Sequence, residues 1–230
     1  MTTTVLAGST GLVGSFILDT LTSLPAIKQI YAYTRRDLPT SSPNVTSLTS
    51  SDPSTWPSSF PTTPVPQLFL SGLGTTRAAA GSLENQRKID LDLNLALAKA
   101  AKAAGVDTYV LISSTGANAS SRFPYIKMKG ELEEAVMGLG FKHVVLVKPG
   151  MILGDRKETR VVEWVIRTFG RGLGSVSTAL TDSWAAEARV IGRAAVRAGL
   201  DCVEGKREEG VWELGQSDII RLGRTEWKET

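Results

Sequence analysis

The chain has 230 residues, of which 42% are hydrophobic and 21% are charged. This length suits one α/β domain, and the composition supplies a sizeable core and excludes a disordered chain. One cysteine and one histidine exclude an intrachain disulfide and a two-histidine zinc site, so we expect no metal centre. The net charge of +3 comes without a basic run, and we expect no nucleic-acid partner.

The apolar runs are short. Those at 109–112 and 144–147 have the length of strands and fall far below the roughly 18 residues of a membrane-spanning helix. The first apolar run starts near Thr3 and has no basic leader before it. We therefore expect an intracellular, soluble protein with no membrane-spanning segment.

Short apolar runs alternate with helical patterns, which indicates parallel β-α-β units. Continuous apolar runs, rather than alternating ones, are typical of strands that helices cover on both faces. We expect strands at 3–7, 29–34, 67–71, 109–113, 144–148 and 211–214. The predicted fold is α/β, a Rossmann-type doubly wound parallel sheet. It forms one domain over 1–230, in which about 154–230 build the substrate side.

Helices are expected over 12–21, 93–104 and 128–139, where apolar residues recur at intervals of three and four. Further helical patterns run over about 159–169 and 184–198, and they carry Trp164 and Trp184, which are candidates either for the core or for the substrate site. Segment 37–67 holds seven of the ten prolines. It should form an irregular crossover with a short strand near 45–48 and a helical turn around Trp56.

A glycine-rich turn separates the first predicted strand from the first helix. Glycines at this spacing let the backbone turn tightly and approach a pyrophosphate, and the helix N-terminus offers unpaired N–H groups to the phosphates. A purely structural turn is the alternative. The residues predicted to bind a dinucleotide are Gly8, Ser9, Thr10, Gly11, Leu12, Val13 and Gly14.

Arg35 and Arg36 follow the second strand, and Arg35 lies 21 residues after Gly14. An acidic residue near this point would favour NAD, whereas a guanidinium matches the 2′-phosphate of NADP in charge and geometry. We therefore predict that NADP(H) is preferred over NAD(H), with a solvated basic turn as the alternative. Asp52, after the third strand, is a candidate partner for the adenine amino group.

Two further strand ends should meet the cofactor, because ligands lie at the carboxyl ends of strands in an open parallel sheet. Small residues after the strand at 67–71 let a ribose approach the backbone. Proline and glycine after the strand at 144–148 turn the chain out of the sheet beside the nicotinamide. The candidate cofactor residues there are Gly72, Leu73, Gly74, Thr75, Pro149, Gly150 and Ile152.

Ser113 and Ser114 end a predicted strand at the same edge, and Tyr125 and Lys129 lie four residues apart on the next helix. An ordinary tyrosine has a pKa of about 10, and a neighbouring ammonium should lower it enough for acid–base work. Lys129 should also hydrogen-bond the nicotinamide ribose while a serine hydroxyl holds the substrate oxygen. A packed tyrosine and a surface lysine are the structural alternative.

Taken together, these motifs resemble the atypical short-chain dehydrogenases/reductases. Their order is similar to the human Tat-interacting oxidoreductase-like protein, and closer to a fungal family named for being found in the mitochondrial proteome. Further segments that carry the resemblance are Gly74-Thr-Thr-Arg77, Lys129-Gly-Glu131, Asp155-Arg156, Glu163-Trp164 and 217–227.

The resemblance implies a Rossmann-type domain that binds NADP(H), with Ser114, Tyr125 and Lys129 in the catalytic positions. It also implies peripheral association with the mitochondrial outer membrane. Ser114 precedes Tyr125 by only 11 residues, so Ser113 is a second candidate for the working hydroxyl.

Two functions remain open at this point. The first is an NADP-dependent oxidoreductase that acts on a small carbonyl or alcohol substrate. The second is an NADP(H)-binding regulatory or scaffold protein with a protein partner, which the small C-terminal region and the regulatory role of the human relative favour. Non-redox chemistry in the same pocket is a weaker third, and a homo-oligomer is compatible with all of them.

Overall fold

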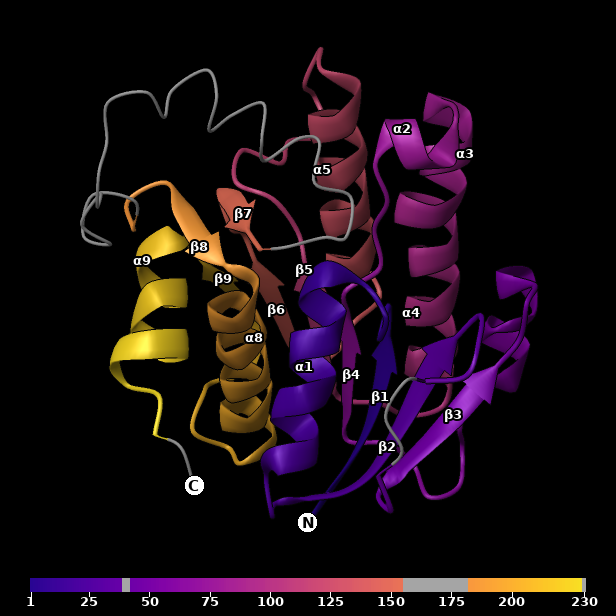
Figure 1. Ribbon diagram of the computed structural model, residues 1–230, viewed down its shortest axis with the longest axis vertical. Helices are drawn as coiled ribbons and strands as arrows, with labels where there is room; N and C mark the ends of the chain where they lie inside the picture. Colours follow the sequence, from indigo (N-terminus) through magenta and orange to yellow (C-terminus); the bar gives the residue numbers. More distant parts are fainter. Residues whose placement is uncertain (39–41, 155–181, 229–230) are drawn as a thin grey trace.

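The computed structural model describes residues 1–38, 42–154 and 182–228. At its centre is a seven-stranded parallel sheet with the strand order β3-β2-β1-β4-β5-β6-β9 (Figure 1). This confirms the α/β, Rossmann-type fold and each expected strand, with bounds that differ by at most two residues. The strands are β1 (Thr2–Ala7), β2 (Ile27–Thr34), β3 (Val45–Thr49), β4 (Leu68–Ser71), β5 (Thr108–Ile112), β6 (His143–Val147) and β9 (Gly210–Leu214).

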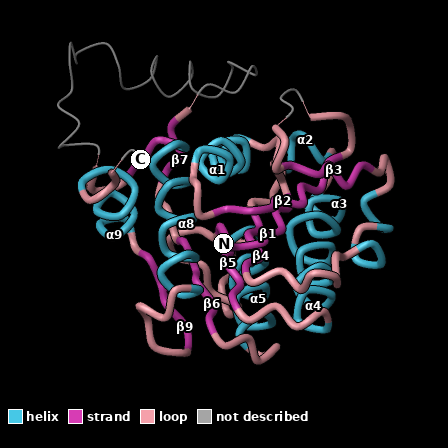
Figure 2. The backbone as a smooth tube through the Cα atoms, turned by 90° about the horizontal axis from the view of Figure 1, so that it is seen from below, coloured by secondary structure: helices cyan, strands magenta, loops and turns pink. Residues whose placement is uncertain are grey.

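Helices cover both faces of the sheet (Figure 2). One face carries α1 (Leu12–Ser23) and α8 (Ala188–Val203), and the other carries α4 (Asn94–Ala103) and α5 (Pro124–Met137). Neighbouring strand residues belong to opposite cores: Leu6 packs in the α1 and α8 core, and Val5 in the α4 and α5 core. Burial on both sides explains why the strands are continuous apolar runs.

The proline-rich crossover is ordered around one tryptophan. Two 3-10 turns, Pro53–Thr55 and Pro57–Ser59, flank Trp56. The Trp56 ring stacks on Tyr33 at a centroid distance of 5.3 Å, and the Tyr33 hydroxyl donates to the Trp56 carbonyl at 2.9 Å. The predicted helical turn around Trp56 is therefore confirmed, and β3 confirms the short strand predicted near 45–48.

The elements between β4 and α4 were not predicted from the sequence. The chain there forms α2 (Arg77–Ala80), α3 (Leu83–Arg87) and a π-helical segment, Lys88–Leu93, that continues into α4. The available signals were the two N-caps, since the Thr76 hydroxyl accepts the Ala79 N–H at 3.1 Å and Ser82 caps α3 in the same way.

The helix predicted over 184–198 is wrong at its start. Ala185–Glu187 form β8, which pairs in parallel with β7 (Met151–Leu153), and α8 begins only at Ala188 and runs to Val203. The cause is tertiary: a Cβ on Gly150 would lie 2.2 Å from the Trp184 carbonyl oxygen, so the glycine permits this approach. The helix predicted over 159–169, with Trp164, lies outside the described residues.

The C-terminal region continues from β9 into α9 (Gln216–Ile220) and a π-helical turn, Arg221–Thr225. Trp184 is 49% exposed and belongs to neither the core nor the cavity described below. In the described ranges, no helix combines the length and the apolar character that crossing a bilayer requires.

Gly130, in the middle of α5, lets the preceding loop fold back onto the helix. The Asn118 N–H donates to the Ile126 carbonyl at 3.2 Å. A Cβ on Gly130 would lie 2.2 Å from the backbone nitrogen of Ala119. This contact fixes the loop that joins β5 to Tyr125.

We expect Gly130→Ala to lower the free energy of unfolding by about 1–3 kcal/mol, because the added methyl group displaces the loop backbone. Helix propensity alone would give the opposite sign, by about 1 kcal/mol. Urea denaturation measures the change. Gly138→Ala is the matched control, since its Cβ would meet nothing closer than 3.5 Å. Equal stability of the two variants would contradict this packing.

Candidate active site

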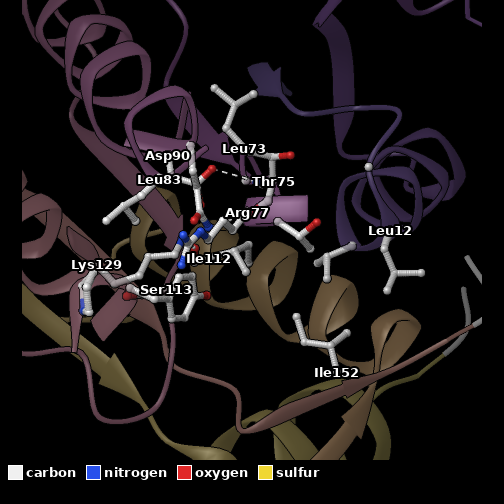
Figure 3. Close-up of a pocket in the computed structure, with 18 residues that line it drawn as sticks. Leu12, Leu73, Thr75, Arg77, Leu83, Asp90, Ile112, Ser113, Lys129 and Ile152 are labelled. Atoms are coloured by element: carbon white, nitrogen blue, oxygen red, sulfur yellow. Dashed lines mark hydrogen bonds between the residues drawn. The ribbon is translucent and has the colours of Figure 1, made fainter. Parts of the chain in front are cut away.

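A cavity of about 540 Å³ opens at the carboxyl ends of the parallel strands (Figure 3). Its walls come from the turn after β1, the segment after β4, the π-helical segment, the end of β5, the start of α5, and β7. The residues that line it include Gly11, Leu12, Val13, Gly72, Leu73, Gly74, Thr75, Arg77, Asp90, Ile112, Ser113, Tyr125, Lys129 and Ile152.

The turn after β1 depends on glycine at two positions. Gly8 has a φ of +84°, and a Cβ there would lie 2.7 Å from the backbone of Gly72. A Cβ on Gly14 would lie 1.9 Å from the Gly8 carbonyl oxygen. The glycines therefore let β1, α1 and the segment after β4 approach one another more closely than side chains would allow.

The N-terminus of α1 faces the cavity with unpaired donors. Gly11 is the N-cap residue and supplies no side-chain cap. The first N–H groups of a helix have no partner within it, and Leu12 and Val13, which carry two of them, line the cavity. Free N–H groups and the positive end of the helix dipole suit a pyrophosphate, so these residues fit the phosphates of a dinucleotide.

Ser9 and Thr10 do not line the cavity. The buried Ser9 hydroxyl donates to the Tyr33 carbonyl at 2.8 Å and fastens the turn to β2. Thr10 is exposed. Of the predicted glycine-turn residues, the cavity is thus lined by Gly11, Leu12 and Val13.

The predicted adenosine contacts lie outside this cavity. Arg35 and Arg36 are exposed just beyond the end of β2. Asp52 caps the following 3-10 turn, where its carboxylate accepts the Ser54 N–H at 2.9 Å. Their contacts with a cofactor stay predictions.

After β6, Ile152 lines the cavity, whereas Pro149 and Gly150 hold the chain in place. The Pro149 carbonyl accepts the Thr115 N–H at 2.9 Å, and the Gly150 N–H donates to the Gln216 side chain at 3.1 Å.

The structure brings Tyr125, Lys129 and the two serines together. Lys129 is only 4% exposed, and its ammonium donates to the Ile112 carbonyl at 3.2 Å. Tyr125 lies at the mouth with 41% of its surface exposed, and its phenol hydrogen-bonds with Ser114. Ser113 lies deeper and lines the cavity.

Asp90 was not predicted as a site residue, and its carboxyl is 1% exposed in the cavity wall. It accepts the Thr75 N–H at 2.7 Å, and the Gln86 amide bridges to the Thr75 carbonyl at 3.0 Å. The available signal was helical spacing, since Asp90 and Asn94 extend the buried stripe that continues at Leu97. Polar residues on a buried stripe require partners.

Glu133 was also missed. It is buried one helical turn beyond Lys129 and accepts the Ser113 hydroxyl. It also pairs with Lys148 at 3.1 Å, and Lys148 reaches Glu213 of β9 at 3.2 Å. The buried Glu133 carboxylate is therefore paired, which avoids the penalty of several kcal/mol for an isolated buried ion.

Burial sets the acid–base properties of the site. It lowers the pKa of Lys129, and Asp90 and Glu133 oppose that shift. It raises the pKa of Asp90, which Lys129 and the hydrogen bonds from Thr75 and Gln86 oppose. Each carboxylate thus helps to keep the buried ammonium charged.

The expected lowering of the Tyr125 pKa is wrong. Burial raises the pKa of this phenol, and the negative charge of Asp90 raises it further, while the Ser114 hydrogen bond opposes both effects. The physical reason is that Lys129 points to the Ile112 carbonyl and is shared with two carboxylates. Tyr125 is therefore a protonated phenol at neutral pH.

Comparison with known proteins now places the chain in a family. No family model matches it. It is 49% identical to "Protein fmp52, mitochondrial" of Emericella nidulans, over 97% of this chain and 100% of that protein. It is 45% identical to the fmp-52 protein of Neurospora crassa, over 99% and 98%. The chain belongs to the fungal Fmp52 family. The resemblance stated from the motifs is confirmed.

Solved structures share the fold of this Fmp52-family chain at low identity. A short chain dehydrogenase family protein from Francisella tularensis superposes with a TM-score of 0.67 at 11% identity, over 95% of this chain and 98% of that one. The Bordetella bronchiseptica enzyme WbmH, solved in complex with NAD+, gives 0.67 at 15% identity, over 93% and 75%.

We expect Asp90→Asn to lower the pKa of the Tyr125 phenol, because it removes a negative charge that disfavours the phenolate. The wild-type pKa should lie above the ordinary tyrosine value. NMR titration of ¹³C-labelled tyrosine rings measures both, with Tyr125→Phe to assign the signal. Asp92→Asn, at an exposed neighbouring position, is the control. An unchanged or raised pKa in Asp90→Asn would contradict this electrostatic account.

Proposed function

We propose that this chain is an NADP(H)-dependent oxidoreductase that transfers hydride between the nicotinamide and a small carbonyl or alcohol. One observation carries the proposal: Tyr125 and Lys129 line the same cavity as the uncapped N-terminus of α1. A dinucleotide with its phosphates at that helix end would extend its nicotinamide along the cavity toward the phenol. The fold shared with dehydrogenase-family structures supports this reading.

A bound nicotinamide supplies the hydride chemistry, and the side chains supply orientation and a proton. Tyr125 keeps its proton at neutral pH, which is the form that proton donation to a carbonyl oxygen requires during reduction. Lys129 is held against the Ile112 carbonyl and presents its remaining N–H groups to a ribose hydroxyl. Ser114, beside the Tyr125 phenol, holds the substrate oxygen. Ser113 has its hydroxyl proton committed to Glu133 and is the weaker candidate.

The preference for NADP(H) is part of the proposal. Arg35 and Arg36 are exposed at the end of β2, where a 2′-phosphate would lie if the adenosine follows the usual path over the sheet edge. A guanidinium favours that phosphate over a free ribose hydroxyl.

We also propose a mitochondrial location at the surface of the outer membrane. The relatives are named as mitochondrial proteins, which supports the mitochondrial part of this proposal. A protein partner at that surface would account for the location.

We expect Tyr125→Phe to reduce turnover of small carbonyl compounds with NADPH by about 10²–10⁴-fold, because the proton donor is lost. The affinity for NADPH should change little. Stopped-flow kinetics and calorimetry measure the two quantities, and Tyr31→Phe on β2 is the control for loss of a tyrosine hydroxyl elsewhere.

Absence of wild-type turnover over a broad carbonyl panel would contradict the oxidoreductase. If NADPH still bound and a protein partner were retained only in its presence, the regulatory or scaffold function would replace it.

We expect Arg35→Ala to weaken binding of NADPH by about ten- to 150-fold, the equivalent of a charge-assisted contact of roughly 1.5–3 kcal/mol. Binding of NADH should be nearly unchanged. Calorimetric titration measures both, and Arg87→Ala is the matched control because Arg87 pairs with Glu131 on the surface at 2.6 Å. An equal loss of affinity for NADPH and NADH would refute the proposed contact between Arg35 and the 2′-phosphate.

A further inference from the structure

One charged residue of the cavity has no part in the proposed hydride and proton transfer. Arg77, the first residue of α2, lines the cavity with Tyr125 and Lys129. In Figure 3 its side chain extends into the middle of the cavity, on the side of Asp90 and Ser113. Among the described residues it has no hydrogen-bond or ion-pair partner.

The backbone that carries Arg77 is fixed on both sides. The Asp90 carboxylate accepts the Thr75 N–H at 2.7 Å, and the Gln86 side-chain amide donates to the Thr75 carbonyl at 3.0 Å. The Thr76 hydroxyl caps α2 at Ala79. A guanidinium that starts from a fixed backbone loses less freedom when it binds a ligand.

Within the described part of the chain, Arg77 differs from the other charged side chains of the cavity in having no partner of opposite charge. Among the described residues, the charged side chains that line the cavity are Arg77, Asp90 and Lys129. Lys129 lies near two carboxylates, Asp90 and Glu133, whereas Arg77 forms no ion pair with a described residue. Its guanidinium is therefore available to an anionic group of a ligand.

The remaining wall is mostly apolar. Leu73, Leu83, Ile112 and Ile152 contribute hydrocarbon surface around Arg77. Ligand sites of this kind bind an apolar body and fix its orientation through a few polar groups. A guanidinium pairs with a carboxylate through two parallel hydrogen bonds, which also fixes its direction.

We propose that Arg77 binds a carboxylate of the substrate, so that the cavity takes a small oxo acid or hydroxy acid with an apolar chain. This inference rests on the proposed oxidoreductase function. With the carboxylate on Arg77, the carbonyl group of the same molecule lies toward Tyr125 and Ser114.

The reaction balances with one proton from the solvent. In reduction, the hydride leaves the reduced nicotinamide dinucleotide by cleavage of its C4–H bond, which oxidises the dinucleotide, and it forms a new C–H bond at the carbonyl carbon. The π-electron pair moves to the oxygen, which takes the proton of the Tyr125 phenol. The solvent proton restores the Tyr125 phenol, and the carboxylate is unchanged.

The test compares matched substrates in the full chain loaded with NADPH. Straight-chain 2-oxo acids are set against their methyl esters, in wild type, Arg77→Gln and Arg77→Lys. We expect Arg77→Gln to lower kcat/KM for the acids by about ten- to 150-fold and for the esters by less than about threefold. Arg77→Lys should recover part of the loss, because lysine keeps the positive charge but cannot form the two parallel hydrogen bonds of a guanidinium. Arg87→Gln is the control for loss of a guanidinium nearby.

A loss that is equal for acids and esters would overturn the inference. So would a loss that appears in the Kd of NADPH, since Arg77 would then hold a cofactor phosphate.

Direct binding separates this inference from the proposed function. Calorimetry of the NADPH-loaded protein with a saturated carboxylic acid and its amide needs no turnover. Binding of the acid that is lost in Arg77→Gln would support the carboxylate site even if no carbonyl were reduced. Reduction of esters and acids alike, with no preference for the acid, would uphold the oxidoreductase and refute the site.

Discussion

Lys129 carries a positive charge into a part of the molecule from which water is nearly excluded, and the surrounding structure compensates that charge. The Ile112 carbonyl at the end of β5 accepts one of its protons. Asp90 from the π-helical segment and Glu133 from α5 supply negative charge. An unpaired buried ammonium would cost several kcal/mol, so the helices on this face of the sheet must keep both carboxylates in place.

This arrangement has consequences for the chemistry of the neighbouring phenol. Because the charge of Lys129 is shared with two carboxylates, it does not bring the pKa of Tyr125 down, and burial raises it. Tyr125 therefore keeps its proton at neutral pH, the form that the proposed reduction requires. Arg77, by contrast, has no ion-pair partner among the described residues of the cavity. The proposed cofactor, proton-donor and anion positions thus share one cavity at the sheet edge.

The fold and the location of the site were predictable because they depend on local patterns. Apolar runs specify the buried strands, and the glycines of the turn after β1 are required by contacts as close as 1.9 Å. Tyr125 and Lys129 share a helical face through their spacing alone. The strand β8 was not predictable, since Ala185–Glu187 pair only because Gly150 admits the Trp184 carbonyl. Asp90 and Glu133 were missed because their partners are distant in the chain, and with them the sign of the Tyr125 pKa shift was missed.

A crystal structure of the protein with NADP+ tests the central claim most directly. The account predicts that the pyrophosphate lies on the N–H groups of Leu12 and Val13. It also predicts that the nicotinamide C4 faces the space beside Tyr125, with room for a reacting carbon at about 3–3.5 Å. A dinucleotide bound elsewhere, or one whose nicotinamide points away from Tyr125 and Lys129, would contradict it.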